Sequence, residues 1–451
     1  MFNKTIFTAI SVCAVLYLSS CREDYDFPAL DKDLKVSSDT ISVDTVYNFS
    51  KSETYVLKLY NPDDKDLTIP QLKLNKGKDS YFNIIVDGKS GSDFTNIPIR
   101  KKDSLYVFIE IDAREALTNP LYEDEIVIQT NQKSQFVKLL SWVERAKIHS
   151  KNEVITNAIW TKNEAHVIDE NLSVSDLTIE EGTSVYFKKD ASLTIANAGK
   201  LNVKGSLGKE VKFRSARHDN KYDSIPNQWK KITLSPNSQS KISYAKIIGG
   251  DIGLEVKNAT LDINNSYIVN HQSYGILADN STILGYNILL NNTNISTLAI
   301  ENGGNYEFYH STFSNYFNMV GTAGSSYSLT INNKNNSLNK AIFGNCIFYS
   351  QRALNAIELT KNDQYPFTYN FDTNIIKNGN TTTLNVLTAA GFTKSIVGDP
   401  EFVNAGYKSN KLKVKDTSKA LKAGNVNIST KYPLDYYGKS RANNPTLGAI
   451  Q

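Results

Sequence analysis

An internal repeat in the second half of the chain constrains its fold more than any other feature. Six segments of six residues begin and end on an apolar side chain, and their last residues advance by 21, 21, 24, 35 and 28 positions. The segments are Ile242–Ile247, Ile263–Ile268, Leu284–Leu289, Phe308–Phe313, Phe343–Phe348 and Phe371–Ile376. A constant minimum step with a variable excess is typical of a solenoid whose coils carry loop insertions. We therefore predict parallel strands stacked at about 4.8 Å, with like apolar side chains in ladders inside the coil.

The odd spacing between the two apolar ladders predicts a bend near the second and third positions of each segment. Tyr244, Tyr286 and His310 share one of these bend positions, and His271 lies on the turn of a neighbouring coil beside Tyr274. We predict that these five side chains are exposed and form a surface that binds sugar rings or a protein partner. Ordinary solvent-facing residues without a ligand are the alternative.

Small and polar residues recur at two further columns of the repeat. Two positions past the last ladder stand Gly249, Asn270, Asn291, Asn315, Ser350 and Asn378. Asparagines stacked at a corner are expected to hydrogen-bond the backbone of the turns, which is a structural role. Cys346 falls in a column with Ala245, Ser266 and Ser311, so we interpret it as a small packed residue and not as a nucleophile.

From about residue 150, the short β runs are separated by gaps too short for crossover helices. The pattern resembles the right-handed parallel β-helix family, which includes pectate lyases and many bacterial surface proteins. The resemblance implies a β-helix over 147–400 and a C-terminal cap of its last coil over 401–451. In that last part, three stretches look like the segment that closes many such surface lipoproteins, although Lys422 stands where the family has an acid: Gly398–Val403, Ser418–Gly424 and Pro445–Gln451.

Residues 35–146 form a separate all-β region, in which short strands alternate with polar turns and no helical periodicity is present. The stretch Tyr55–Pro62, followed by Leu67–Ile69, resembles the immunoglobulin-like modules of bacterial surface proteins. The fold class that we predict for the whole chain is therefore all-β, with a small β-sandwich ahead of the β-helix. The sandwich lacks clustered His, Cys or paired acids, which favours a spacer or docking role.

The N-terminus follows the plan of a secreted lipoprotein. Lys4 precedes an apolar run, Ile6–Leu18, and Leu18-Ser19-Ser20-Cys21 looks like a lipobox. This predicts a signal peptide over 1–20, lipid attachment at Cys21 and a flexible tether over 21–34, with an ordinary signal peptide as the alternative. The acidic cluster after Cys21 resembles the export signal of bacteroidete-type lipoproteins, which implies an outer-membrane protein exposed on the cell surface; a solvated tether is the alternative.

Charge and acid placement limit the chemistry of the chain. Lys and Arg number 50 against 46 Asp and Glu, a net charge of +4 that gives no reason to expect nucleic acid as a partner. Metal-ligand spacings are missing and the acids of the repeats do not share a column, so we expect no metal, no cofactor and no catalytic residue. We predict a non-enzymatic surface protein that binds glycan or an envelope partner. The alternative is a polysaccharide lyase or hydrolase with a site in the long gap between Phe313 and Phe348.

Overall fold

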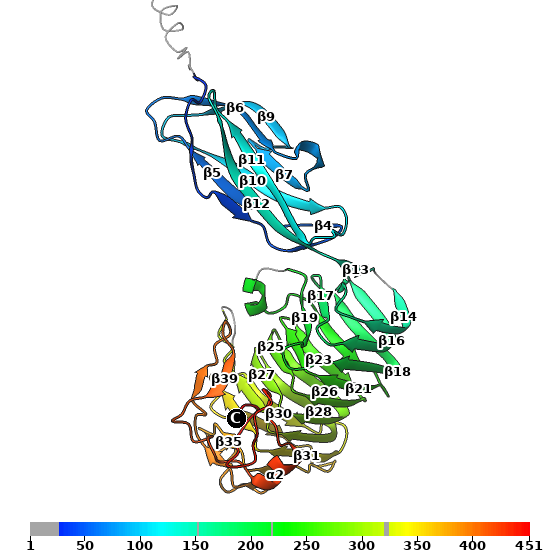
Figure 1. Cartoon of the computed structure of the whole chain (residues 1–451). Coiled ribbons are helices and arrows are strands. Elements are labelled where there is room, and N and C mark those ends of the chain that lie inside the picture. The colour runs from blue at the N-terminus through cyan, green and yellow to red at the C-terminus, as the bar shows by residue number, and fades with distance from the viewer. Residues whose placement is uncertain (1–26, 151–152, 218–219, 320–323) are drawn as a thin grey trace, which may run out of the picture. The chain divides into compact units, whose positions relative to one another are not determined.

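The computed structural model describes residues 27–150, 153–217, 220–319 and 324–451. The chain divides into two compact units, Met1–Glu144 and Arg145–Gln451 (Figure 1). The first contains mainly antiparallel sheets and the second contains large parallel sheets, which confirms the predicted fold class of a β-sandwich followed by a parallel β-helix. The predicted signal peptide and Cys21 lie outside the described residues.

The first unit is built from two six-stranded sheets. One sheet contains β1 (Lys35–Val36), β4 (Ser50–Lys51), β5 (Tyr55–Tyr60), β7 (Phe82–Val86), β8 (Lys89–Gly91) and β10 (Ser104–Ala113). The other contains β2 (Thr40–Ser42), β3 (Val46–Tyr47), β6 (Leu67–Leu74), β9 (Asp93–Ile99), β11 (Leu121–Gln129) and β12 (Ser134–Glu144), and a short 3-10 helix, η1 (Gly77–Asp79), follows β6. Alternate residues of the long strands β10 and β12 are buried between the sheets, as the two-residue period of a strand requires.

The described part of the predicted tether, residues 27–34, belongs to this packed unit. Leu30 and Leu34 are 3% and 5% exposed and join the core of the sandwich. The Leu30 amide donates to the carbonyl of Thr68 at 2.8 Å, and Ala29 forms a parallel bridge to the same residue. The prediction of a flexible tether through residue 34 is therefore corrected for these residues, because burying two leucines offsets the entropy of ordering them.

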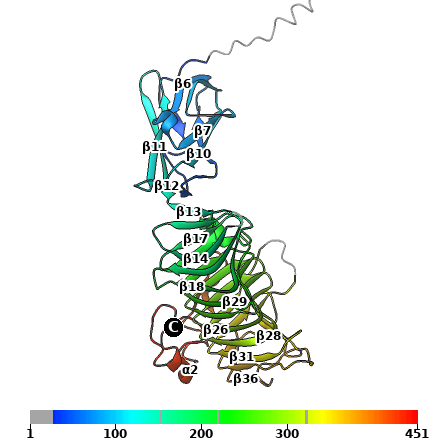
Figure 2. The same ribbon diagram turned by 90° about the vertical axis from the view of Figure 1, so that its right-hand side faces the viewer.

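The second unit winds through two long parallel sheets, and the chain returns to both of them again and again as it coils (Figure 2). The first sheet contains eleven strands: β13 (Ala146–His149), β15 (Ala165–Ile168), β17 (Ser184–Phe187), β19 (Val211–Ser215), β22 (Ala245–Ile248), β25 (Tyr267–His271), β27 (Leu289–Thr293), β29 (Thr312–Asn315), β32 (Ile347–Ser350), β35 (Ile375–Ile376) and β37 (Ile396–Val397). The second contains β14 (Val154–Trp160), β16 (Asn171–Glu180), β18 (Ser192–Lys204), β20 (Lys231–Leu234), β21 (Gln239–Ser243), β23 (Ile252–Lys257), β24 (Thr260–Asn264), β26 (Tyr274–Tyr286), β28 (Ser296–Tyr309), β30 (Tyr327–Asn332), β31 (Leu338–Gly344), β33 (Ile357–Thr360), β34 (Asn370–Asp372) and β36 (Phe392–Thr393).

The C-terminal segment, which we call the tail (residues 401–451), packs along the flank of the eleven-stranded sheet. It contains an antiparallel pair, β38 (Phe402–Asn404) and β39 (Lys411–Val414), and the short helix α2 (Val426–Lys431), while a 3-10 helix, η2 (Asn220–Ser224), lies earlier in the unit. Buried residues of the tail form a second apolar cluster with outward-facing Leu289, Ile347 and Ile375. Where we predicted a cap of the last coil, the structure therefore shows a lateral cover over several coils (Figure 1).

The strand register agrees with the predicted ladders except in the third repeat. In the next coil, Ile263 pairs with Gly285 and not with the predicted Leu284. Likewise, Ile268 pairs with Leu290 and not with Leu289. The coil gains one residue between Val269 and Tyr274, since the step between equivalent residues is 21 before this turn and 22 after it. A shift of one residue turns every side chain to the other face, so Leu284 and Leu289 point away from the coil interior.

The bend predicted between the ladders is a column of left-handed residues. Its members all have a positive φ, between 44° and 56°: Tyr244, Asn265, Asn287, His310, Asn345 and Thr373. Asparagine is the non-glycine residue that best tolerates this conformation, which explains its abundance in the column. Tyr286 does not belong to it, because it pairs with Asn264 and Tyr309 one position earlier.

Asn315, Asn378 and Cys346 have the structural roles that the sequence predicted, whereas the corner position of the third repeat is Asn292 and not Asn291. The Asn315 amide donates to the carbonyl of Tyr327 at 2.9 Å, and that of Asn378 donates to Leu384 at 2.8 Å. Cys346 is fully buried in its column, and its amide donates to the Asn374 side chain at 2.7 Å. Burial raises the pKa of the Cys346 thiol to about 12, so it is not poised as a nucleophile.

Candidate functional site

The tail covers Tyr244 and Tyr286, which we predicted to be exposed. The ring of Tyr436 lies 6.2 Å from that of Tyr244, measured between centroids. Tyr432 contacts two neighbouring coils at once: its ring stacks on Tyr309 at 5.0 Å and lies tilted against Tyr286 at 4.7 Å. Tyr244 and Tyr286 are consequently half-buried, and the ring of each contacts a tyrosine of the tail at a tilt.

His310 is fully buried under the tail, so its predicted exposure is wrong. The Asn345 amide donates to His310 Nε2 at 3.0 Å, and the same nitrogen lies 2.9 Å from the hydroxyl of Ser429 in α2. Burial and the neighbouring Arg441 hold the pKa of His310 well below its usual range. The imidazole is therefore a neutral acceptor that attaches the tail to the β-helix.

His271 and Tyr274 lie apart from this surface. His271 is fully buried beside Trp229, where its Nδ1 accepts from the Gly250 amide at 3.1 Å and its Nε2 donates to the Ile247 carbonyl at 3.2 Å. Burial lowers the pKa of His271 to about 4, so its predicted surface position is wrong. Tyr274 is half-buried at the start of β26, in the other sheet. The five predicted residues therefore do not form one site.

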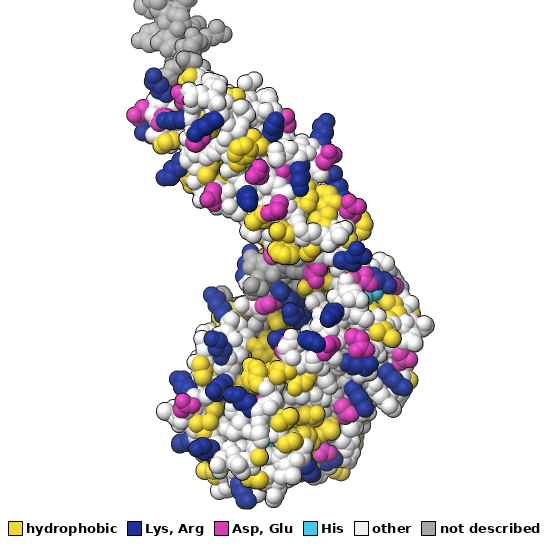
Figure 3. Space-filling model, viewed as in Figure 1, with side chains coloured by type: hydrophobic (Ala, Val, Ile, Leu, Met, Phe, Trp, Pro, Cys, Tyr) yellow, Lys and Arg dark blue, Asp and Glu magenta, His cyan; other side chains and the backbone are white. Residues whose placement is uncertain are grey.

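A groove of about 560 Å³ lies where the tail meets the flank of the β-helix. We call it the flank groove, and its lining comes from β22, β25 and β27 on one side and from the tail on the other. The lining residues are Glu210, Lys246, Tyr267, Leu289, Val403, Ser409, Asn410, Lys411, Leu412, Lys413, Tyr436, Tyr437 and Ile450. Figure 3 shows hydrophobic side chains interspersed with lysines and arginines on the face of this unit where β27 and β39 are seen in Figure 1.

The aromatic part of the flank groove combines buried and exposed tyrosines. Tyr436 is 3% exposed, and burial raises its pKa, while the adjacent Tyr437 is 52% exposed and meets Tyr436 edge-on at 5.0 Å. Across the groove, the Tyr267 hydroxyl donates to the Asn410 carbonyl at 3.5 Å. The ring of Tyr437 is therefore accessible to a ligand, and its packing against the buried Tyr436 holds it in place.

Buried asparagines fix the tail side of the groove. The side-chain oxygen of Asn410 accepts from the amides of Asn291 and Asn292 at 2.8 and 2.7 Å, and its own amide donates to Tyr407 at 2.9 Å. The side-chain amide of Asn270 also donates a hydrogen bond to the Tyr407 carbonyl at 3.0 Å. Buried polar networks of this kind rigidify the segments that they join, so the groove is preformed.

Lysines dominate the charge of the flank groove. Of the described residues that line it, Glu210 alone carries a carboxylate, and it pairs with Lys246 at 3.4 Å. Lys411 and Lys413 alternate with buried Leu412 and Val414 on β39, so both ammonium groups point to solvent. Neither has an ion-pair partner within the described parts of the chain. The groove can therefore attract polar and anionic groups, and it lacks the two facing acids that glycoside hydrolysis uses.

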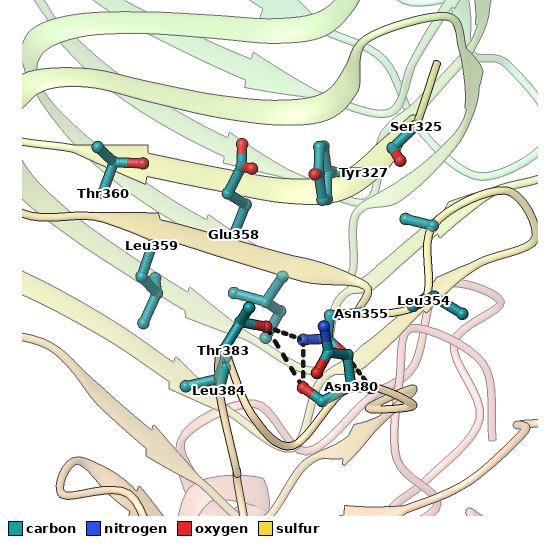
Figure 4. Close-up of a pocket in the computed structure, with 12 residues that line it drawn as sticks. Ser325, Tyr327, Leu354, Asn355, Glu358, Leu359, Thr360, Asn380, Thr383 and Leu384 are labelled. Carbon is teal, nitrogen blue, oxygen red and sulfur yellow. Dashed lines mark hydrogen bonds between the residues drawn. The ribbon is translucent and has the colours of Figure 1, made fainter. Parts of the chain in front are cut away.

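A second pocket, of about 360 Å³, lies beside β33, next to the long insertion where we had placed the alternative enzyme site (Figure 4). Its lining includes Tyr327 from β30, while the Asn355 side chain donates to the Asn380 carbonyl at 2.9 Å. Burial, followed by the neighbouring Glu358, raises the pKa of the Tyr327 hydroxyl. Glu358 is the one acid among the described residues around this pocket, so it too lacks a pair of carboxylates.

A histidine pair at the start of the β-helix was not singled out by the sequence. His149 Nε2 lies 3.0 Å from His166 Nδ1, and His149 Nδ1 lies 3.1 Å from a carboxylate oxygen of Glu153. The His166 ring stacks on Trp160 at 4.1 Å, and burial lowers its pKa to about 3. Strands β13 and β15 pair at an offset of 19 residues, so His149 and His166, which are 17 residues apart, lie two positions out of register, and the repeat spacing does not reveal the pair.

No group of three or more His, Cys, Asp or Glu side chains in the described ranges is arranged to hold a metal ion. Across those same ranges, the structure contains no helix with the length and apolarity that crossing a membrane requires.

Fold and groove together define the class of the molecule as a β-helix protein with an N-terminal β-sandwich. No protein-family model and no curated protein matches the sequence. Among solved structures, the chain is similar to a family 123 glycoside hydrolase from Clostridium perfringens that was studied for glycolipid glycan hydrolysis. That match has 10% identity and a TM-score of 0.20, and it covers 29% of this chain and 30% of the other. A likeness of this extent carries no argument about activity.

Proposed function

We propose that this protein is a cell-surface lipoprotein that binds glycan through the flank groove without cleaving it. The observation that carries the proposal is the accessible ring of Tyr437, which packs against buried Tyr436 and lines the same groove as Lys411 and Lys413. Sugar rings present an apolar face of C–H bonds to aromatic side chains, while their hydroxyl and acidic groups need polar partners at the rim. A preformed groove with both kinds of group meets these requirements.

Anchoring at the membrane is part of the same proposal. The lipobox before Cys21 supports acylation, and the acidic residues after it support export to the outer surface, with the immunoglobulin-like module next along the chain. Leu30 is already packed in the sandwich, and roughly nine residues separate it from Cys21. Such a stretch spans at most about 30 Å. The lipid would therefore hold the sandwich close to the membrane surface.

A glycan array probed with the purified protein tests the proposal, followed by titration of the glycans that bind. Tyr437→Ala should weaken binding about tenfold, which corresponds to about 1.4 kcal/mol. Phe136→Ala is the matched control, since Phe136 is 53% exposed in the sandwich against 52% for Tyr437. Binding by wild type that Tyr437→Ala leaves intact would reject the groove as the site. New reducing ends or unsaturated uronates in the incubated glycan would show catalysis and contradict the proposal.

A further inference from the structure

A row of exposed apolar side chains crosses the outer face of one sheet of the sandwich. Strands β5, β10 and β7 pair so that Val56 lies opposite Phe108, and Phe108 lies opposite Ile85. The alternate residues of these strands, among them Leu57 and Val107, are fully buried on the inner face. Val56 and Phe108 are 40% and 37% exposed, so the row faces solvent across three strands.

A second aromatic side chain extends this row along β10. Tyr106 is 43% exposed, and its ring centroid lies 6.5 Å from that of Phe108 with 24° between the ring planes. Tyr60 lies two residues beyond Lys58 on the same face of β5. Together these side chains form a continuous surface, which we call the aromatic platform: Val56, Lys58, Tyr60, Ile85, Tyr106 and Phe108.

Two lysines bring positive charge to the aromatic platform. Lys58 lies opposite Tyr106 in the register, and its ammonium is 4.7 Å from the centre of that ring. Lys35 lies opposite Tyr60, with its ammonium 5.8 Å from the ring centre. Within the described residues, neither lysine has a carboxylate partner. Each ammonium is held by an aromatic face and is available to an anion.

The acids nearest to the platform along β10 are already engaged. Glu110 accepts a hydrogen bond of 2.6 Å from the hydroxyl of Thr54. Asp112 pairs with Lys51 at 3.4 Å. The Thr54 bond leaves the charge of Glu110 in place, so three lysines (Lys35, Lys51 and Lys58) stand against two carboxylates on this part of the sheet face, a local excess of one positive charge.

We propose that the aromatic platform binds an extended polysaccharide chain whose sugar rings carry carboxylates. The rings of Tyr106 and Phe108 meet the C–H faces of successive sugar rings, and the ammonium groups of Lys58 and Lys35 meet their carboxylates. An open sheet face suits a chain that lies across it better than the end of a short oligosaccharide. This site is separate from the flank groove and does not depend on glycan binding there.

Isothermal titration of the purified protein with polygalacturonate tests the platform, and fully methyl-esterified polygalacturonate is the uncharged comparison. The double variant Tyr106→Ala/Phe108→Ala should weaken binding at least about tenfold. Lys58→Gln should weaken it less and reduce its dependence on salt, since one charge contact is removed. Phe136→Ala and Tyr437→Ala should bind as wild type does. Because all these side chains are exposed, thermal melts should show every variant folded.

Several results would overturn this proposal. If the wild-type protein does not bind polygalacturonate, acidic polysaccharides are excluded as the ligand. If the Tyr106→Ala/Phe108→Ala variant binds as tightly as wild type, the aromatic platform is excluded as the binding site. Binding lost with Tyr437→Ala alone places the polymer in the flank groove. A second copy of the chain is another occupant of an apolar sheet face. Sedimentation equilibrium that shows a dimer dissociated by the double variant would identify that occupant and reject the polysaccharide.

Discussion

The shift of register in the third repeat can be tested by substituting two adjacent residues. Gly285 stands in the inner ladder between Ile263 and Phe308, whereas Leu284 is half-buried on the outer side. A β-carbon at Gly285 would lie 2.5 Å from a ring carbon of Phe308 and 2.6 Å from a methyl carbon of Ile288. Favourable carbon contacts lie at about 3.5–4.0 Å, so the neighbours must move by about 1 Å.

The cost of that movement follows from the packing around Phe308. Its ring is stacked on Phe343 at 5.6 Å and meets Phe313 edge-on at 5.5 Å. Because the ring is fully buried between these neighbours, it cannot move away from an added methyl group without disturbing them. Overpacking of this kind costs about 1–3 kcal/mol, and the lower entropy of the unfolded alanine chain offsets about 0.4–1 kcal/mol. Gly285→Ala should therefore destabilise the β-helix by about 1–2 kcal/mol, and Gly285→Val by more. Leu284→Ala should cost less than about 1 kcal/mol, because that side chain is only partly buried, on the outer side of the sheet.

Urea unfolding followed by circular dichroism measures these differences. The transition of the β-helix is compared between variants at matched slope, because a solenoid need not unfold in one step. If Leu284→Ala cost 2–5 kcal/mol and Gly285→Ala cost little, Leu284 would be the inward residue and the register described above would be wrong.

Three further outcomes are expected. Phe313→Ala should cost about 3–5 kcal/mol in the same unfolding assay, since the fully buried ring stacks on Phe348 at 5.1 Å; a loss below about 1 kcal/mol would contradict its inward position. His271 has a pKa of about 4 in the folded chain, below the ordinary 6.5, so only the unfolded chain takes up a proton as pH falls through this range. Its contribution of about 3 kcal/mol is therefore complete above pH 6.5 and lost on acidification towards pH 4, and the stability of His271→Asn, measured against pH, should fall less steeply than that of wild type. Mass spectrometry of the mature protein should find acylated Cys21, and an unmodified N-terminus at another residue would reject the anchor.

Much of the β-helix is readable from local sequence. The ladders of Ile263, Phe308 and Phe343 could be predicted because an inward position tolerates only apolar side chains, and the pattern returns with each coil. Cys346 was placed by the same logic from Ala245, Ser266 and Ser311, although the column also contains Ile288 and Asn374. The third repeat could not be placed this way. An added residue in the turn before Tyr274 changes the step, and Leu284 fits the apolar pattern better than Gly285 does.

The candidate site depended on contacts that no local pattern records. The partners of Tyr286 and His310 are Tyr432 and Ser429, more than a hundred residues later in the chain, and they convert a predicted exposed stack into a covered one. The tail returns along the flank because outward apolar residues such as Leu289 gain more by packing against it than by facing water. Local patterns in the sequence were therefore sufficient to predict the coil and its inner ladders. Which outer face stays open could not be predicted in this way, because it depends on where a distant segment of the folded chain buries its own apolar side chains.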